Sequence, residues 1–145
     1  MATLRPLSLV LAAMAGIGVA SAFTPQTAPS PDARTKNLSN IKQVALATFM
    51  YATDWDDRLP AAKSRNGLMV AVQPYLKDMM IFKIEGGELR FDTQLSGTLW
   101  SDVKSLKDRP MYWAKTEIMP NPYLVAFTDG HCKYIAEEYW KSLVK

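Results

Sequence analysis

The stretch from Asn37 to Pro60 constrains the fold more than any other part of this 145-residue chain. It contains no glycine, and no proline before Pro60. The residues that recur at helical spacing are Leu38, Ile41, Val44, Ala45, Thr48, Tyr51, Ala52 and Trp55. This 3.6-residue period predicts an amphipathic helix with one face against a core. The residues that lie off this stripe, and are expected to meet water, are Asn40, Lys42, Gln43 and Thr53.

The carboxyl end of this helix is predicted to lie before Pro60, because proline disfavours helical geometry at the preceding residue. Three aspartates crowd this end: Asp54, Asp56 and Asp57. The helix dipole disfavours negative charge there, so the cluster is expected to leave the helix as a loop or to find a positive partner. Arg58 is the nearest candidate.

Residues 1–22 have the pattern of a secretory signal peptide. Arg5 gives a positive start, residues 7–19 are apolar, and Ala20-Ser21-Ala22 matches a small-residue cleavage site. The apolar run is shorter than the roughly 20 residues that a spanning helix needs, and an uncleaved membrane anchor is the alternative. Residues 23–33 contain several prolines and no apolar periodicity, which predicts a flexible linker. One domain is therefore expected over residues 34–145.

The rest of the chain alternates between short helical and extended patterns. A second helix is expected over residues 67–76, with an irregular last turn at Pro74. Residues 79–84 and 88–91 read as a hairpin around a glycine turn, and residues 111–114 as a further strand. A short amphipathic helix is expected over residues 136–144.

Residues 125–135 predict a β-hairpin whose turn is Asp129-Gly130. A two-residue Asp-Gly turn suits the positive φ angles of type I′ geometry. The register that follows pairs Thr128 with His131, Phe127 with Cys132, and Val125 with Tyr134. Residues opposite one another share a face, so the expected core face holds Val125, Phe127, Cys132 and Tyr134.

Two segments of the chain resemble one known family. LSNIKQVALATFMYATDWDDRLP at 38–60 and VAFTDGHCKYI at 125–135 are similar to bacterial pseudopilin-like proteins of the His-x9-Asp-Gly subgroup, which are related to type II secretion and type IV pilins. The residues that carry the resemblance are Leu38, Ser39, Asn40, Lys42, Gln43, Tyr51, Asp54, Asp57, Pro60, Phe127, Asp129, Gly130 and His131. Met119 stands where the family has its first histidine, and the predicted signal peptide stands in place of the prepilin leader.

The resemblance implies an α+β fold: a long amino-terminal amphipathic helix packed on a small antiparallel sheet, with a short carboxyl-terminal helix. It further implies an exported, non-enzymatic structural or interaction module without a cofactor, located in the periplasm or at the cell surface. Its expected partners are other envelope or secretion-system proteins, with membrane contact only if the signal segment stays uncleaved. The alternative is a cell-surface metal- or glycan-binding protein.

Composition argues against nucleic acid as a partner. The formal net charge is only +3, the lysines and arginines are scattered, and no nucleic-acid-binding motif is present. The sequence also lacks a phosphate-binding glycine loop, a G-x-S-x-G elbow and an H-E-x-x-H helix. No catalytic residue is therefore predicted.

A few side chains still need to be weighed as sites. Asp129 and His131 are weak metal candidates, because a site needs three or more converging groups. Cys132 is expected to be a small core residue with an inert thiol. The three aspartates near residue 55 lack the glycine of an EF-hand loop, which favours a solvated helix end over a calcium site. The four tryptophans could line a sugar-binding surface or, more commonly, fill a small core.

Overall fold

The computed structural model describes residues 30–145. The predicted signal peptide and most of the predicted linker lie outside this range. Helices and antiparallel sheets are mixed in the described residues, which confirms the α+β class. Within residues 30–145, no helix is both long and apolar enough to span a bilayer.

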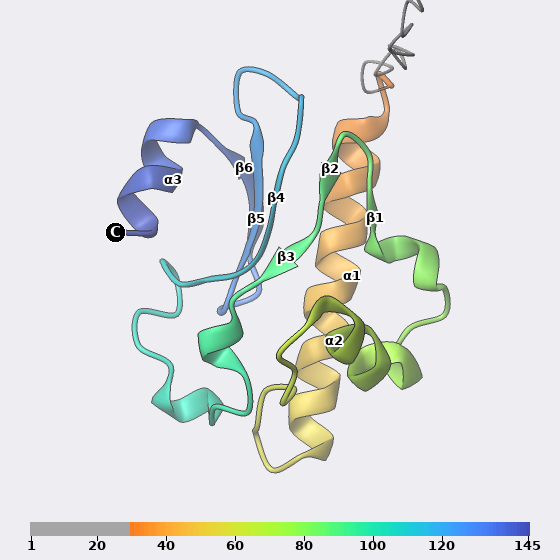
Figure 1. Ribbon diagram of the computed structural model, residues 1–145, viewed down its shortest axis with the longest axis vertical. Helices are drawn as coiled ribbons and strands as arrows, with labels where there is room; N and C mark the ends of the chain where they lie inside the picture. The colour runs from red at the N-terminus through yellow and green to blue at the C-terminus, as the bar shows by residue number, and fades with distance from the viewer. Residues whose placement is uncertain (1–29) are drawn as a thin grey trace, which may run out of the picture.

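The helices are α1 (Ala33–Asp54), α2 (Arg65–Val72) and α3 (Glu137–Leu143) (Figure 1). The strands are β1 (Lys83–Ile84), β2 (Gly87–Glu88), β3 (Arg90–Phe91), β4 (Pro110–Lys115), β5 (Tyr123–Phe127) and β6 (Cys132–Ile135). Short 3-10 segments are η1 (Gln73–Tyr75), η2 (Met79–Phe82), η3 (Thr93–Leu95) and η4 (Trp100–Asp102). Most expected elements are present, but residues 79–82 are 3-10 helix rather than strand. The Asp78 carboxylate caps that turn by accepting a hydrogen bond from the Met80 amide at 2.8 Å.

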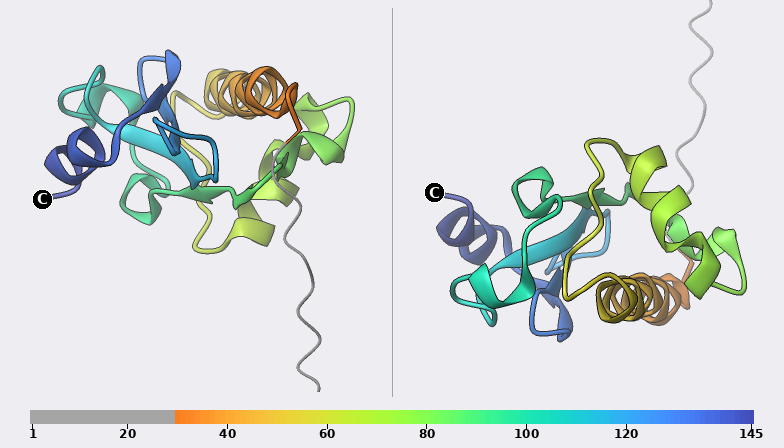
Figure 2. Two further views of the ribbon diagram at one scale, coloured as in Figure 1. Left: turned by 90° about the horizontal axis from the view of Figure 1, so that it is seen from above. Right: turned by 90° about the horizontal axis from the view of Figure 1, so that it is seen from below.

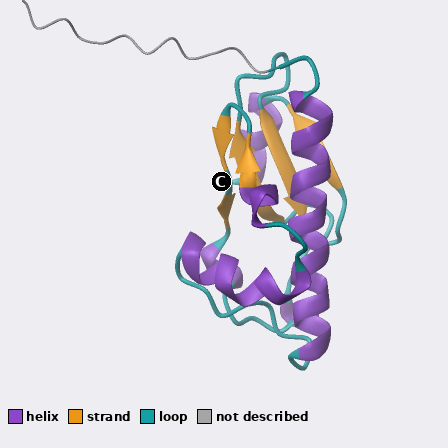
Figure 3. Ribbon diagram, turned by 90° about the vertical axis from the view of Figure 1, so that its right-hand side faces the viewer, coloured by secondary structure: helices purple, strands orange, loops and turns teal. Residues whose placement is uncertain are grey.

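The main sheet lies between α1 and α3. Its strand order is β3-β4-β5-β6, all antiparallel, while β1 and β2 form a separate hairpin. Figure 2 views α1 nearly end-on, and Figure 3 shows it running along the strands. The sheet residues facing α1 include Tyr112, Leu124 and Ala126, whereas Val125 and Phe127 pack toward α3. The strand β5 is therefore buried on both faces, and its burial does not alternate.

The expectation that Asn40 meets water is wrong. Its exposed fraction is 8%, and its side-chain amide donates to the Lys83 carbonyl at 3.0 Å. Asn37, one helical turn earlier, is fully buried. Its side-chain Nδ2 donates to the Glu85 backbone carbonyl, and its Oδ1 accepts from the Glu85 backbone amide, both at 2.9 Å. The two asparagines thus pair the backbone of the β1–β2 hairpin with α1, which is why they can be buried without an unsatisfied polar group.

The carboxyl end of α1 lies before Pro60, as predicted, and Asp56 and Asp57 leave the helix in a turn. The helix ends at Asp54, because Asp56 and Asp57 adopt positive φ angles of 51° and 57°. Aspartate tolerates this left-handed conformation better than most residues. Trp55 was expected on the buried stripe, but this turn leaves its side chain 57% exposed.

The predicted register of the β5–β6 hairpin is wrong by one residue. Ala126 pairs with Cys132 and Leu124 pairs with Tyr134. The Phe127 amide donates to the His131 carbonyl, and the Gly130 amide donates to the Phe127 carbonyl, both at 2.9 Å. The connection is therefore a three-residue loop with Gly130 at a φ of +92°, not a two-residue turn. This change puts Cys132 and Tyr134 on the α1 side, away from Val125 and Phe127, because side chains alternate along a strand.

Candidate functional site

A cleft at the carboxyl end of α1 brings the two motifs together. It has a volume of about 360 Å³, and we call it the α1–turn cleft. Its lining residues are Phe49, Ala52, Thr53, Asp57, Trp100 and Asp129. Asp57 belongs to the first motif and Asp129 to the second. The fold thus places two acidic residues and two aromatic ones, Phe49 and Trp100, around one opening.

Backbone hydrogen bonds join the exit turn of α1 to the segment that carries Trp100. The Leu59 amide donates to the Thr98 carbonyl at 2.9 Å, and the Trp100 amide donates to the Asp57 carbonyl at 2.8 Å. Arg58 was the expected partner of the aspartate cluster, but its guanidinium donates to the Gly97 carbonyl at 3.3 Å. The position of Asp57 beside Trp100 is therefore set by the backbone.

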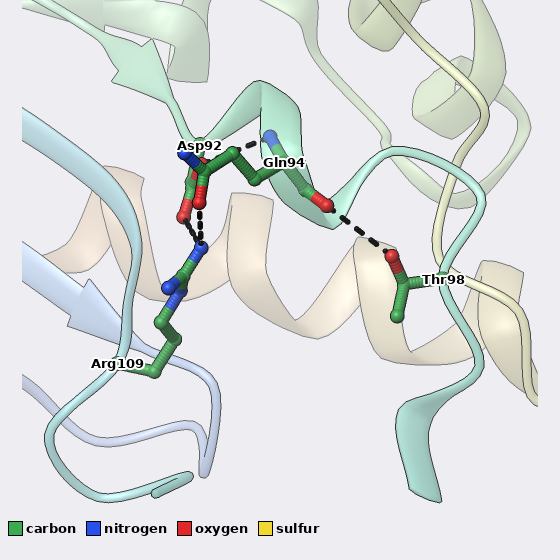
Figure 4. Close-up of polar contacts among 4 residues, drawn as sticks. All are labelled: Asp92, Gln94, Thr98 and Arg109. Carbon is green, nitrogen blue, oxygen red and sulfur yellow. Dashed lines mark hydrogen bonds and ion pairs between the residues drawn. The ribbon is translucent and has the colours of Figure 1, made fainter. Parts of the chain in front are cut away.

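A polar cluster of Asp92, Gln94, Thr98 and Arg109 holds the same segment in place (Figure 4). The Arg109 guanidinium pairs with the Asp92 carboxylate and donates to the Gln94 side-chain oxygen at 3.0 Å. The Thr98 hydroxyl donates to the Gln94 carbonyl at 3.3 Å. Arg109 directly precedes β4, so these contacts tie the excursion between β3 and β4 to the start of β4.

The Asp-Gly turn forms the opposite side of the cleft. Its Asp129 amide donates to the Leu106 carbonyl at 3.2 Å, and the Thr128 hydroxyl donates to the same carbonyl at 2.9 Å. A Cβ atom on Gly130 would lie 2.9 Å from Cε2 of Phe49. Only glycine allows α1 and the turn to approach so closely, and it also accepts the positive φ. Phe49 in turn meets Trp100 edge to face, with ring centroids 4.7 Å apart.

Asp129 is held by its neighbour His131. Its Oδ1 accepts from the His131 backbone amide at 3.1 Å and lies 2.5 Å from the ring Nδ1. The imidazole stacks on Phe127 with centroids 4.2 Å apart. Burial opposes ionisation of Asp129, but the hydrogen bonds from the backbone and ring of His131 outweigh it and hold the pKa of this carboxyl below its usual value. Asp129 is therefore negatively charged at neutral pH.

The structure brings the two metal candidates together, but not as a complete ligand set. Across residues 30–145, no group of three or more His, Cys, Asp or Glu side chains is placed to hold a metal ion. Cys132 is half-buried against the α1 side of the sheet, with Sγ 3.7 Å from the Gly130 carbonyl oxygen. Burial raises the pKa of its thiol to about 11, so the nucleophilic thiolate is scarce at neutral pH.

The remaining motif residues have separate roles. Leu38 packs against the core, and Pro60 is buried. Ser39, Lys42 and Gln43 are exposed on α1, where the Gln43 amide donates to the Ser39 carbonyl at 3.3 Å.

The other acidic and aromatic candidates spread over the surface and the core. The Tyr51 ring stacks on Trp55, and the Asp54 carboxylate accepts from the Tyr75 hydroxyl at 2.9 Å. Trp113 and Trp140 pack together between the sheet and α3, so the four tryptophans do not share one surface.

Sequence reasoning did not find Phe49 and Trp100 as cleft residues. Phe49 lies one position outside the predicted stripe. The only sequence signal for its role is Gly130, because a glycine in a turn allows another side chain to pack closely against it. Nothing in the local sequence links Trp100 to either motif. Both residues reach the cleft only because long-range backbone hydrogen bonds bring the segment around Trp100 next to the exit turn of α1.

Comparison with known proteins gives no match. No protein-family model, curated protein or solved structure is significantly similar to this chain. The resemblance to pseudopilin-like proteins therefore rests on the motif residues alone. What the chain does has to be argued from the geometry of α1, the cleft and the surface around them.

Proposed function

We propose that this chain is an exported, non-enzymatic structural and interaction module of the pseudopilin-like class. The observation that carries the proposal is an apolar pair on the outward face of α1. Leu46 is 58% exposed and Met50 is 46% exposed. They lie four positions apart, which makes them neighbours on the helix surface. Adjacent exposed apolar side chains on a rigid element are typical of a protein contact.

The way α1 is anchored supports this reading. One side of the helix packs on the main sheet, and the adjoining side is fixed to the β1–β2 hairpin by Asn37 and Asn40. Leu46 and Met50 on the outward face are exposed among the described residues, while the helix itself is held in place. This arrangement suits a module that presents one helix to its neighbours, as the resemblance implies for a secretion- or pilus-related assembly.

Photo-cross-linking in the native cell envelope tests the interaction. A benzophenone amino acid at position 46 or 50 is expected to capture a defined envelope or secretion-system protein. The matched control is position 70 on α2, because Val70 is also an exposed apolar helix residue, at 69%. Equal capture from positions 46, 50 and 70, or capture from none of them, would overturn the proposal.

The exported state has its own test. The intact mass of the protein from its native cell is expected to match residues 23–145, in the soluble fraction. A mass that matches the whole chain in the membrane fraction would instead assign residues 7–19 to an anchor. That outcome would overturn release from the membrane while leaving the contact face on α1 in place.

Glycan binding is a second candidate, favoured by the surface around Trp55. The exposed indole stacks on Tyr51 with centroids 5.4 Å apart, next to the hydrogen-bonded pair of Tyr75 and Asp54. An aromatic face beside a carboxylate is suited to the apolar face and the hydroxyl groups of a sugar. Glycan-array binding that is lost in Trp55→Ala and kept in Met50→Ala would favour this candidate. An array without hits would reject it.

A further inference from the structure

The α1–turn cleft has a charge that its own lining does not balance. Its six lining residues include two acidic ones, Asp57 and Asp129, and no lysine or arginine. Among residues 30–145, Asp129 has no lysine or arginine as an ion-pair partner, and its carboxylate contacts only the backbone amide and the imidazole of His131. Within the described part of the chain, Asp57 makes no ion pair. The cleft is therefore an acidic opening that a cation from outside would complement.

The walls of the cleft favour one kind of cation. Phe49 and Trp100 line it with aromatic surface, at an edge-to-face angle of 74°. A guanidinium group is flat, stacks on aromatic rings, and can donate to carboxylates through its planar fork. A metal ion would need more oxygen ligands than two carboxylates supply, and an ammonium group would use the aromatic walls less fully.

We infer that the α1–turn cleft binds an arginine side chain of a partner protein. This inference deepens the proposed function and rests on it for the existence of that partner. Thr53 lines the cleft and lies on the same exposed side of α1 as Leu46 and Met50. A partner segment that places apolar residues on this helix face can therefore insert an arginine beside Asp57 and Asp129.

The test is a titration of ¹⁵N-labelled protein with a short peptide, Ac-Leu-Arg-Leu-NH₂, followed by NMR. The expected response is a saturable shift of the Trp100 indole N–H and of the Thr53 and Gly130 amides. The same peptide with citrulline in place of arginine keeps the shape and removes the charge. It is expected to bind at least about fivefold more weakly, because the charge-assisted bonds to the carboxylates are lost.

Asp57→Asn provides the residue-specific test, and Asp56→Asn is its matched control. Both aspartates are exposed, adjacent and at positive φ, but only Asp57 lines the cleft. Asp57→Asn is expected to weaken the arginine peptide about fivefold, whereas Asp56→Asn leaves it within about twofold. Equal weakening by both variants would show general electrostatic attraction and overturn the inference.

Other occupants give distinct results, and each would overturn the inference. Equal binding of the citrulline peptide would mean an apolar site. Calcium chloride that shifts the same signals when the peptide does not would mean a metal site. Concentration-dependent shifts without peptide would assign the cleft to a second copy of the chain. If the peptide does not bind but cross-linking at position 46 succeeds, only the arginine inference is rejected. If the peptide binds but cross-linking fails, the interaction proposal is rejected and the cation site is kept.

Discussion

The two ends of α1 use polar residues in opposite ways. At the amino-terminal end, Asn37 and Asn40 are buried and bonded to backbone groups of the β1–β2 hairpin. At the carboxyl-terminal end, Asp57 is exposed at the mouth of a cleft, and its side chain has no ion-pair partner among the described residues. Polar groups that are buried and paired hold the fold together. Groups that face a cavity without a partner are available to a ligand.

The contrast between the two ends of α1 predicts that the largest loss of stability follows substitution of Asn37. Asn37→Leu is expected to lower the free energy of unfolding by about 3 kcal/mol, because the Glu85 amide and carbonyl both lose the buried partner that Asn37 provides. Urea denaturation measures this loss. Asp57→Asn, at the other end of α1, is expected to leave stability nearly unchanged. Similar effects of the two variants would remove the distinction between the two ends.

The middle of α1 offers a second test, at the buried hydrogen bond between Thr48 and Tyr112. The two hydroxyl oxygens lie 2.6 Å apart, and the Thr48 hydroxyl also lies 2.9 Å from the Val44 carbonyl. Thr48→Val is expected to cost about 2 kcal/mol, since it leaves the Tyr112 hydroxyl buried without a partner. Tyr112→Phe is expected to cost about 1 kcal/mol, because Thr48 keeps its bond to Val44.

The order of these two losses is the informative result, and thermal or urea unfolding of both variants measures it. If Tyr112→Phe were the more costly change, packing of the ring hydroxyl rather than hydrogen-bond pairing would dominate at this site. The idea that buried, hydrogen-bonded polar groups stabilise this fold would then not hold in the middle of α1.

A third and smaller effect is expected where the Asp-Gly turn meets α1. Gly130→Ala is expected to cost about 1.5 kcal/mol, because its Cβ would meet Phe49 and because alanine disfavours a φ of +92°. In a Phe49→Leu background the cost is expected to fall by about 0.5 kcal/mol, which a double-mutant cycle measures. A cost that does not change with residue 49 would mean that backbone conformation alone requires the glycine.

Part of this structure could be predicted from the sequence because the signals were local. The 3.6-residue period indicated the helix that became α1, and the Asp-Gly pair indicated a hairpin. The partners of Asn37 and Asn40 are 48 and 43 residues away, so nothing local distinguished these asparagines from solvent-facing ones. Helix periodicity then assigned Asn40 to water, as it does for most amides.

The hairpin register was missed for a different reason. Every residue of β5 is buried, since α1 covers one face of the sheet and α3 the other. The usual alternation of apolar and polar residues therefore gave no check on the loop length. Contacts with Leu106 and Phe49 fix the three-residue loop, and neither contact is visible in residues 125–135. The cleft was missed for the same reason, because Trp100, the first residue of η4, is placed there by a long-range backbone hydrogen bond to Asp57.

The smallest predicted effect concerns the pH dependence at Asp129. Its pKa is lowered in the folded state, so its contribution to stability is present above the unfolded value and is lost as the pH falls through the folded one. Wild-type protein is therefore expected to lose stability relative to Asp129→Asn as the pH falls from about 5.5 to about 2. Solvent screens this accessible carboxylate, so the relative loss is expected to stay below about 1 kcal/mol.

Urea unfolding at several pH values measures this difference, with Asp56→Asn as the control. The bonds at the Asp129 carboxylate come from His131, two residues away in the same loop, so protonation breaks a local contact and leaves the β5–β6 hairpin paired. A loss as large as that of Asn37→Leu would mean that Asp129 is a structural group like the two asparagines. The acidic group on the turn side of the cleft would then be part of the framework, and its charge would no longer be available to a partner.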